Sequence, residues 1–442
     1  MTLGTRGTHG ETDSPEAASA SDGALASYRS AIRRSWAIYI GVVAVILVVL
    51  ASVVMISWSN GETAHTTLHT AKHPAPPIGL QPISAQPIQR WRSGDHTAIG
   101  TPIWNGTVIT YTTHRVAGRS VVTGDITWSY TRTDREVCQA IQDVGVTIAV
   151  FRNGADCDQV DAFDSETGQR KWSRTLFKDG AHTLGQPTYS VGTFADMNTT
   201  PQVIFAIEPT GGLDRWVFAQ KGCTIRGAVL GLKGALISQV CANQDCNGRK
   251  FCGNGTQLLF RDPTAGREDD ASKNKGNPDQ IFWNQLGNES LPVSADGLIS
   301  SVDVTSRALL VWSLQGKHTA STQLAAGDIR PTSIQARQTS TAELIWIGDR
   351  VYAVTTPDAK ALWSVPTNGP VSATTTSGAT DPTIDLSGSI LLAPVDGGVG
   401  SIDPNTGKLQ TTYPVSAPPD GASVFPLGSA FLIAGNDTIA YQ

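Results

Sequence analysis

The chain has 442 residues, with 33 Lys and Arg against 38 Asp and Glu, and a formal net charge of −5 at pH 7. A slightly acidic chain lacks an extended positive field, so nucleic acid is excluded as an expected partner. Charged residues make up only 16% of the sequence while glycine occurs 44 times, a balance typical of a turn-rich β protein.

The first 27 residues are rich in Ser, Ala, Thr, Gly and Glu and show no apolar periodicity. Such a composition buries too little apolar surface to offset the entropy of ordering the chain. We therefore expect residues 1–27 to be a disordered tail.

A long apolar segment follows. Residues 36–58 read WAIYIGVVAVILVVLASVVMISW and contain no charged side chain. As a helix this segment would be about 34 Å long, enough to cross a hydrocarbon core of roughly 30 Å. Three arginines precede it, Arg29, Arg33 and Arg34, and the next Lys or Arg is Lys72. The sequence predicts a transmembrane helix with a basic flank over residues 28–59, single-pass in the cell membrane, with a cytoplasmic N-terminus and an extracytoplasmic C-terminal domain.

A cleaved signal peptide is the alternative for this segment. The apolar run exceeds the usual length of about 7–15 residues, and no convincing small-x-small cleavage site follows. The first cysteine is Cys138, so no lipid-accepting cysteine follows either. These features favour an uncleaved anchor.

Residues 60–87 carry repeated prolines and predict a semi-extended extracytoplasmic linker. His65, His69 and His73 lie four residues apart, so on one helix they would share a face and offer a divalent metal site. The Asn60-Gly61 pair and Pro74 instead favour a solvated linker.

The rest of the chain, residues 88–442, contains an aromatic repeat. Trp128, Trp172 and Trp216 lie 44 residues apart, and Trp312, Trp363 and Tyr413 follow at strides of 51 and 50. A period of roughly 40–50 residues is the signature of a β-propeller with one four-stranded blade per period. We expect the aromatic residues to pack between blades; the full predicted set is Trp91, Trp128, Trp172, Trp216, Trp312, Trp363 and Tyr413.

Each copy also carries a hairpin turn. In the best copy Asp164 can accept backbone N–H groups and Gly168 supplies a positive φ. Counting turns gives an all-β, eight-bladed propeller, with seven blades as the alternative because residues 182–220 are irregular. The last blade lacks its own tryptophan unit, and residues 88–92 (IQRWR) are an orphan copy of it. We expect this N-terminal strand to complete the last blade and close the ring.

The segment 162–172 (AFDSETGQRKW) resembles the repeat A-x-D-x-x-T-G-x-x-x-W of the quinoprotein-like, PQQ-type propeller family. The resemblance covers residues 89–442 and implies the propeller fold. Some members of this family are quinone-dependent dehydrogenases, and many have no cofactor and serve as binding platforms. The vicinal cysteine pair of many quinoprotein dehydrogenases is missing from this sequence.

All six cysteines follow the apolar segment. Their spacing predicts three disulfides, each of the first two linking neighbouring strands of one blade: Cys138–Cys157, Cys223–Cys241 and Cys246–Cys252. The gaps between Cys241, Cys246 and Cys252 do not fit a zinc site. Disulfides indicate an oxidising compartment outside the cytoplasm.

No catalytic constellation stands out, because the aspartates of the repeat are explained as turn residues. Glu268, Asp269 and Asp270 offer carboxylates for Ca²⁺, but their setting is typical of a solvated loop. We therefore expect no catalytic, cofactor-binding or metal-binding residues. The predicted function is a non-catalytic binding or scaffold module of the bacterial cell envelope; the alternative is a quinone- or metal-dependent dehydrogenase.

Three insertions depart from the repeat, over residues 181–200, 241–255 and 264–279. Because loops collect on the faces of a propeller, we expect these insertions to build one rim and to form the contact surface. The expected partner is an envelope protein, a peptide or a wall polymer.

Overall fold

The computed structural model describes residues 36, 39–52, 62–76, 83–101, 103–143, 145–176, 187–192, 196–242, 253–262, 281–286, 290–325, 327, 329–330, 334–339, 342–356, 358–373 and 391–442. The chain divides into two compact units, residues 1–66 and 67–442.

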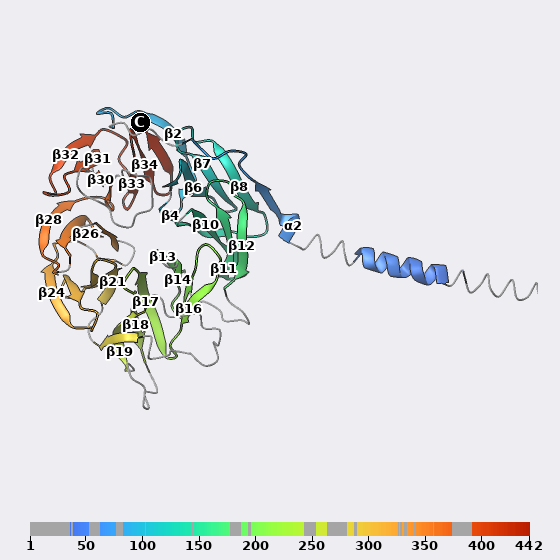
Figure 1. The fold of residues 1–442 in the computed structure, drawn as a ribbon, viewed down its shortest axis with the longest axis horizontal. Coiled ribbons are helices and arrows are strands. Elements are labelled where there is room, and N and C mark those ends of the chain that lie inside the picture. The colour runs from blue at the N-terminus through green and yellow to red at the C-terminus, as the bar shows by residue number, and fades with distance from the viewer. Residues whose placement is uncertain are drawn as a thin grey trace, which may run out of the picture. The chain divides into compact units, whose positions relative to one another are not determined.

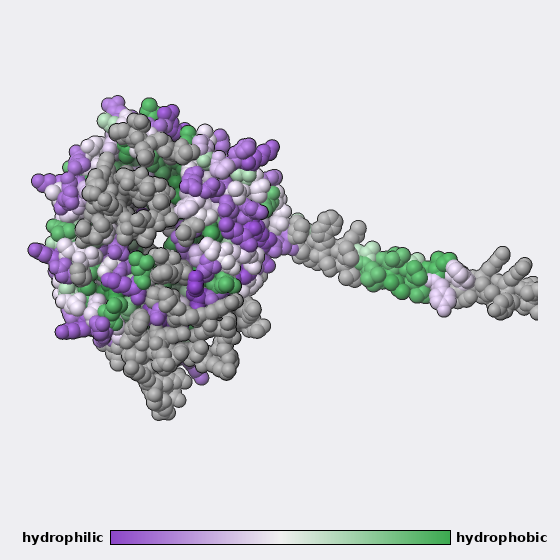
Figure 2. Space-filling view, viewed as in Figure 1, coloured by the Kyte–Doolittle hydropathy of each residue, from purple (hydrophilic) through white to green (hydrophobic). Residues whose placement is uncertain are grey.

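In the first unit, residues 39–52 are helical and their large apolar side chains are exposed, for example Val45 at 63% and Leu47 at 60%. Figure 2 shows this helix as a continuous hydrophobic surface. A search of the described residues finds no helix with both the length and the apolar character needed to cross a membrane. A short helix, α2 (Glu62–His65), follows.

The described residues of the second unit form eight sheets arranged in a ring (Figure 1). Blade 1 contains β1 (Thr66–His69), β3 (His96–Thr97), β5 (Ile103–Trp104), β6 (Thr107–Tyr111), β7 (Arg115–Ser120) and β8 (Ile126–Arg132). Blade 2 contains β4 (Ile99–Gly100), β9 (Val137–Asp143), β10 (Val146–Asn153), β11 (Asp156–Asp164) and β12 (Arg170–Thr175). Blade 3 contains β13 (Thr188–Val191), β14 (Asp196–Thr199), β15 (Ile204–Ile207) and β16 (Asp214–Phe218). Blade 4 contains β17 (Cys223–Leu230), β18 (Ala235–Cys241), β19 (Gly255–Arg261) and β20 (Ile281–Leu286).

Blade 5 contains β21 (Ser290–Ala295), β22 (Ile299–Asp303), β23 (Ala308–Trp312) and β24 (His318–Gln323). Blade 6 contains β25 (Ile334–Gln338), β26 (Ala342–Ile347), β27 (Arg350–Thr355) and β28 (Ala361–Pro366). Blade 7 contains β29 (Ser372–Ala373), β30 (Leu391–Val395), β31 (Gly398–Ile402) and β32 (Leu409–Tyr413). Blade 8 contains β33 (Ser423–Leu427), β34 (Ala430–Ala434), β35 (Thr438–Tyr441) and β2 (Gln89–Ser93). The all-β, eight-bladed prediction is confirmed, and the seven-bladed alternative is wrong.

The ring closes as the orphan segment 88–92 predicts. β2 pairs antiparallel with β35, so a strand from the start of the propeller is the outer strand of the last blade. Reciprocal backbone hydrogen bonds between Ile88 and Gln442, at 2.8 and 3.0 Å, continue this pairing. This closure gives the edge strands β2 and β35 hydrogen-bond partners for backbone groups that would otherwise be exposed.

Part of the segment 60–87 is also a strand of the propeller. β1 pairs with β8 as an additional outer strand of blade 1. The Ala71 N–H donates to Thr167 O at 2.9 Å, and Ala75 is buried. His65 ends α2, His69 ends β1 and His73 lies beyond both, so the three histidines do not share one helix.

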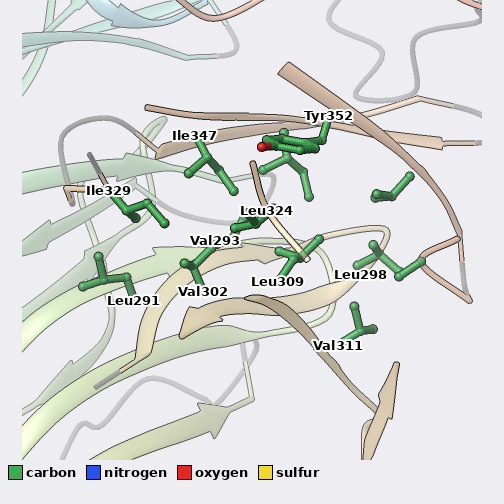
Figure 3. Packing of buried hydrophobic residues seen from close by; sticks show 13 residues of the cluster. Leu291, Val293, Leu298, Val302, Leu309, Val311, Leu324, Ile329, Ile347 and Tyr352 are labelled. Atoms are coloured by element: carbon green, nitrogen blue, oxygen red, sulfur yellow. The ribbon is translucent and has the colours of Figure 1, made fainter. Parts of the chain in front are cut away.

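Apolar clusters fill the spaces between blades. Figure 3 shows one of them, in which Leu291, Val302 and Leu309 of blade 5 pack with Ile347 and Tyr352 of blade 6. Each fully buried side chain of this kind contributes roughly 1.5–3 kcal/mol of transfer free energy.

Four of the predicted tryptophans make the same contact between blades. Trp128 on the outer strand β8 donates from Nε1 to Ser165 O of blade 2 at 2.8 Å, and Trp172 on β12 donates to Pro209 O of blade 3 at 2.8 Å. Trp363 on β28 donates to Pro404 O at 2.9 Å, and Trp91 on β2 donates to Val121 O at 2.8 Å. In each case the indole lies in the turn between the third and fourth strands of the next blade.

The other three aromatic residues differ from this pattern. Trp216 lies at the equivalent position of β16, but its ring faces the guanidinium of Arg261, with 4.7 Å from Cζ to the ring centroid. Trp312 lies on β23, the third strand of blade 5, and not on the outer strand that the repeat predicts. Tyr413 lies two residues beyond the tryptophan position of β32 and packs on Phe431 of blade 8.

Blade 5 has Ala320 at the tryptophan position of its outer strand, opposite Val311 of β23. The repeat also misses the member of blade 4, because an insertion shifts it along the sequence. That member is Trp283 on β20, opposite Phe260 of β19. The 19 residues between β19 and β20 move Trp283 away from the expected stride. Trp312 and Trp283 still touch, with ring centroids 5.6 Å apart.

Candidate functional site

The two faces of the ring carry different turns. The four successive strands of a blade pair antiparallel, so the 1–2 and 3–4 turns lie on one face and the 2–3 turns on the other. In blade 2 the Ser165 N–H of the 3–4 turn donates to Gly145 O of the 1–2 turn at 3.0 Å. We call the side with the 1–2 and 3–4 turns the turn face.

On the turn face, ionisable side chains join the 1–2 turns of blades 4 and 5 to the second strand of blade 6. Lys233 lies between β17 and β18, Asp296 lies between β21 and β22, and Glu343 is the second residue of β26. The first and second strands are the inner strands of each blade, so this turn-face network surrounds part of the ring's centre (Figure 1).

The blade 4 turn is hydrogen-bonded to the blade 5 turn. The Leu232 N–H donates to Asp296 Oδ1 at 2.7 Å, and the Lys233 N–H donates to Ala295 O at 2.8 Å. The Lys233 ammonium donates to Gly297 O. Gly231 permits this approach, because a Cβ there would lie 2.4 Å from the carbonyl carbon of Ala295.

Glu343 holds the same turn from the other side. Its side chain is completely buried, and Oε2 accepts the Leu298 N–H at 3.0 Å. Burial, reinforced by the charge of Asp296, raises the pKa of Glu343 to about 7, against the opposing hydrogen bonds and the charge of Lys233. This carboxyl therefore changes protonation near neutral pH.

The partners of Glu343 are shifted as well. Burial raises the pKa of Asp296, although the Leu232 N–H and Lys233 oppose the shift. Burial lowers the pKa of Lys233, against the attraction of Glu343 and Asp296. Perturbed pKa values cluster at functional sites, so the turn-face network is the candidate site of the described chain.

Two other buried carboxylates, Asp95 and Asp161, are paired with arginines. Asp95 lies 2.6 Å from Arg119 Nη2 and 3.1 Å from Arg115 Nη2. Burial raises the pKa of Asp95, but the two guanidinium groups outweigh burial and the net shift is downward. Asp161, completely buried, lies 2.6 Å from Arg170 Nη2. These pairs stabilise blades 1 and 2 internally.

The turn aspartates have structural roles. Asp164 Oδ1 accepts the Thr167 N–H at 3.0 Å, and Asp403 Oδ1 accepts the Thr406 N–H at 2.9 Å. Gly168 and Gly407 have φ values of +71° and +68°, as the turn chemistry predicts.

Two of the three predicted disulfides are present. Cys223 and Cys241 face each other on the neighbouring strands β17 and β18. Cys138 and Cys157 instead link β9 and β11, which lie on either side of β10. Register shifts on both sides of β10 near Phe151 and Arg152 bring the two cysteines to a Cα separation of 6.1 Å. Cys246 and Cys252 lie outside the described residues.

The insertions do not share one face. Residues 242–254 connect the second and third strands of blade 4, whereas residues 262–280 connect its third and fourth strands. The two connections therefore leave the sheet at opposite ends, and the prediction of one common rim is wrong. More than half of 181–200 is described, and there it forms the strands β13 and β14 of blade 3 and not an inserted loop. Most of 241–255, and all of 264–279 with Glu268, Asp269 and Asp270, lie outside the described residues.

Within the described ranges, no group of three or more His, Cys, Asp or Glu side chains is placed to hold a metal ion. The sequence repeat did not reveal the turn-face network, because its residues come from three blades. The local signal that was available is a glycine near two of the ionisable residues, Gly231 before Lys233 and Gly297 after Asp296.

Comparison with known proteins identifies no family. No family model matches the chain, and no curated protein matches it. Solved structures with a similar fold include BamB from Moraxella catarrhalis, at 14% identity over 80% of this chain and 97% of that chain, with a TM-score of 0.48. Another is the quinohemoprotein alcohol dehydrogenase ADHIIG from Pseudomonas putida HK5, at 12% identity over 84% and 78%, with a TM-score of 0.46. A third is the C-terminal WD40 domain of Sif2, at 12% identity over 82% and 99%, with a TM-score of 0.49.

The strand pairing itself defines the class of protein, a closed eight-bladed β-propeller. Likeness at these identities carries no function over to this chain.

Proposed function

We propose that this chain is a membrane-anchored binding or scaffold module of the bacterial cell envelope, with its propeller outside the cytoplasm. The uncharged segment 36–58 and the arginines before it support the anchor and its orientation. The two disulfides support an oxidising compartment. The proposed partner is an envelope protein or peptide.

The turn-face network is the observation that carries the binding role. Hydrogen bonds that involve Asp296, Ala295 and Leu298 join the 1–2 turns of blades 4 and 5 to each other and to strand β26 of blade 6, so the surface is formed before a partner arrives. A preformed surface loses less conformational entropy on binding. Lys233 and Asp296 are both partly exposed and present a positive and a negative group side by side.

Site-specific photo-crosslinking in intact membranes tests this proposal. One probe replaces Lys317, an exposed residue of the 3–4 turn of blade 5 on the turn face. The matched control probe replaces Ser306, an exposed residue of the 2–3 turn of the same blade on the opposite face. We expect a discrete adduct from position 317 only, and its loss in the Lys233→Gln/Asp296→Asn variant. Equal adducts from both positions, or no adduct, would contradict binding on the turn face.

The dehydrogenase alternative can be tested by separate measurements on the purified protein. Metal analysis of the purified chain, and absorption spectra after addition of quinone cofactor and Ca²⁺, would show stoichiometric metal or a quinone band if that alternative held. We expect neither.

A further inference from the structure

The first strand of blade 6 directs an arginine away from the apolar interface with blade 5. Ile334 and Ala336 of β25 pack against the cluster between blades 5 and 6. Successive residues of a strand point to opposite sides, so Arg337 faces blade 7. Arg337 is the last residue but one of β25, so it lies close to the 1–2 turn and to the turn face.

The guanidinium group of Arg337 lies inside the ring. Its Cζ is 5.5 Å from the ring centroid of Phe425, which lies on β33, the first strand of blade 8. Blade 7 separates blades 6 and 8, and the first strands are the inner strands, so this contact lies toward the centre of the ring (Figure 1). The cation is attracted to the aromatic face. Phe425 has no acceptor oxygen, so the contact leaves the N–H donors of Arg337 without a hydrogen-bond acceptor.

Arg337 lacks the acidic partner that other arginines of this protein have. Arg119 and Arg170 each lie 2.6 Å from a carboxylate oxygen. In the described part of the chain, Arg337 has neither a hydrogen bond nor an ion pair. Burial lowers the pKa of Arg337, and no carboxylate of a described residue opposes that shift. A guanidinium stays charged, and a half-buried charge without a counter-ion is unfavourable.

This position adjoins the turn-face network. Gln338, the residue after Arg337, points to the opposite side of β25 and lies against blade 5. A Cβ at Gly297 would be 3.2 Å from Gln338 Cγ, and Gly297 O accepts the Lys233 ammonium. A partner on the turn face would therefore have Arg337 within reach at the inner edge of the same surface.

We infer that Arg337 binds a carboxylate of the turn-face partner, an Asp or Glu side chain that enters the centre of the ring. The inference rests on the proposed function, since it names the group by which the turn face recognises its protein or peptide partner. A carboxylate accepts two parallel hydrogen bonds from the donor fork of a guanidinium. It also supplies the negative charge that Arg337 lacks, while Phe425 holds the guanidinium in position.

The first test uses the wild-type full chain in detergent and a defined probe, the peptide acetyl-Gly-Glu-Gly amide. We expect a saturable rise of about 2 °C in the melting temperature at constant ionic strength. The matched peptide acetyl-Gly-Gln-Gly amide should have no effect. Equal effects of the two peptides would overturn the inference. Stabilisation by sodium sulfate but not by the glutamate peptide would also overturn it and would identify an inorganic anion as the occupant.

The second test assigns the effect to Arg337. Arg337→Gln should abolish the stabilisation by the glutamate peptide, and Arg337→Lys, which keeps the charge without the donor fork, should retain only part of it. The control Arg307→Gln removes the same charge from an exposed position in the 2–3 turn of blade 5, on the opposite face, and should retain all of it. Full stabilisation of Arg337→Gln would overturn the inference.

The photo-crosslinked adduct from position 317 tests the proposed function separately. If that adduct forms while the glutamate peptide has no effect on the wild-type chain, the carboxylate site is refuted and binding on the turn face stands. If the adduct is missing while the peptide effect depends on Arg337, the proposed function is contradicted and the carboxylate site stands.

Discussion

Trp128 of blade 1 lies directly on Gly168 of blade 2. A Cβ at Gly168 would be 2.6 Å from Cδ2 of the indole, and Trp128 Nε1 donates to Ser165 O of the same turn at 2.8 Å. Gly212 lies likewise against Trp172, and Gly407 against Trp363. The glycine of each turn thus provides both the positive φ and the space that the neighbouring indole occupies.

Gly168→Ala should therefore destabilise the protein for two reasons, a strained φ of +71° and a clash with Trp128. Gly154→Ala is the matched control in the same blade, since its φ is +66° but nothing lies within 4 Å of the added Cβ. We expect a loss of about 1–2 kcal/mol in the free energy of unfolding for Gly154→Ala. Gly168→Ala should lose about 1–3 kcal/mol more. Urea unfolding measures both, and equal losses would show that the indole contact contributes nothing.

At the boundary between blades 5 and 6, both the turn glycine and the tryptophan of this contact are replaced by alanine. The turn of blade 6 has Ala359 at φ +52° where other blades have glycine, and the preceding blade has Ala320 at the tryptophan position, opposite Val311. Ala320→Trp alone should destabilise the protein, because its indole would meet the methyl group of Ala359. Ala359→Gly should relieve part of that loss. A double-mutant cycle in urea should give a favourable coupling of about 0.5–3 kcal/mol; additive effects would refute this pairing.

Glu343 makes stability depend on pH. Its pKa is about 7 in the folded protein and near the ordinary 4.5 in the unfolded chain, so the unfolded state releases the proton first as pH rises. Stability is therefore highest below pH 4.5 for this group and is lost as pH rises through 7. The shift corresponds to about 3 kcal/mol. Glu343→Gln should remove this component, so the difference in unfolding free energy between variant and wild type should grow from pH 5 to pH 8. If the difference in unfolding free energy stayed constant from pH 5 to pH 8, that result would contradict the raised pKa of Glu343.

The disulfide of blade 2 gives a prediction on connectivity. Non-reducing peptide mapping should recover Cys138 linked to Cys157, although the two residues lie on strands separated by β10. Cys138→Ser/Cys157→Ser should lower the free energy of unfolding by roughly 3 kcal/mol, because the cross-link restricts the unfolded chain. Recovery of Cys138 with another cysteine would refute the pairing.

The architecture was predictable because its signals are local. Asp164 with Gly168, and Asp403 with Gly407, mark hairpins within a few residues, and the spacing of Trp128 and Trp172 marks the period. Local counting fails where an insertion intervenes, and for that reason it misses Trp283 of blade 4. It also places Trp312 on the outer strand of blade 5, where the structure has Ala320.

The candidate site was not predictable for a different reason. Lys233, Asp296 and Glu343 belong to three blades, and nothing in their sequence spacing links them before the ring forms. A propeller repeat predicts which strands neighbour each other, but not which polar residues meet across blades.

The ion pair between Arg92 and Asp437 joins residues 345 positions apart. During synthesis from the N-terminus, β2 emerges early, whereas its partner β35 emerges last. The propeller therefore reaches its final topology only after translation is nearly finished, and a chain truncated before Thr438 would leave β2 without its pairing strand.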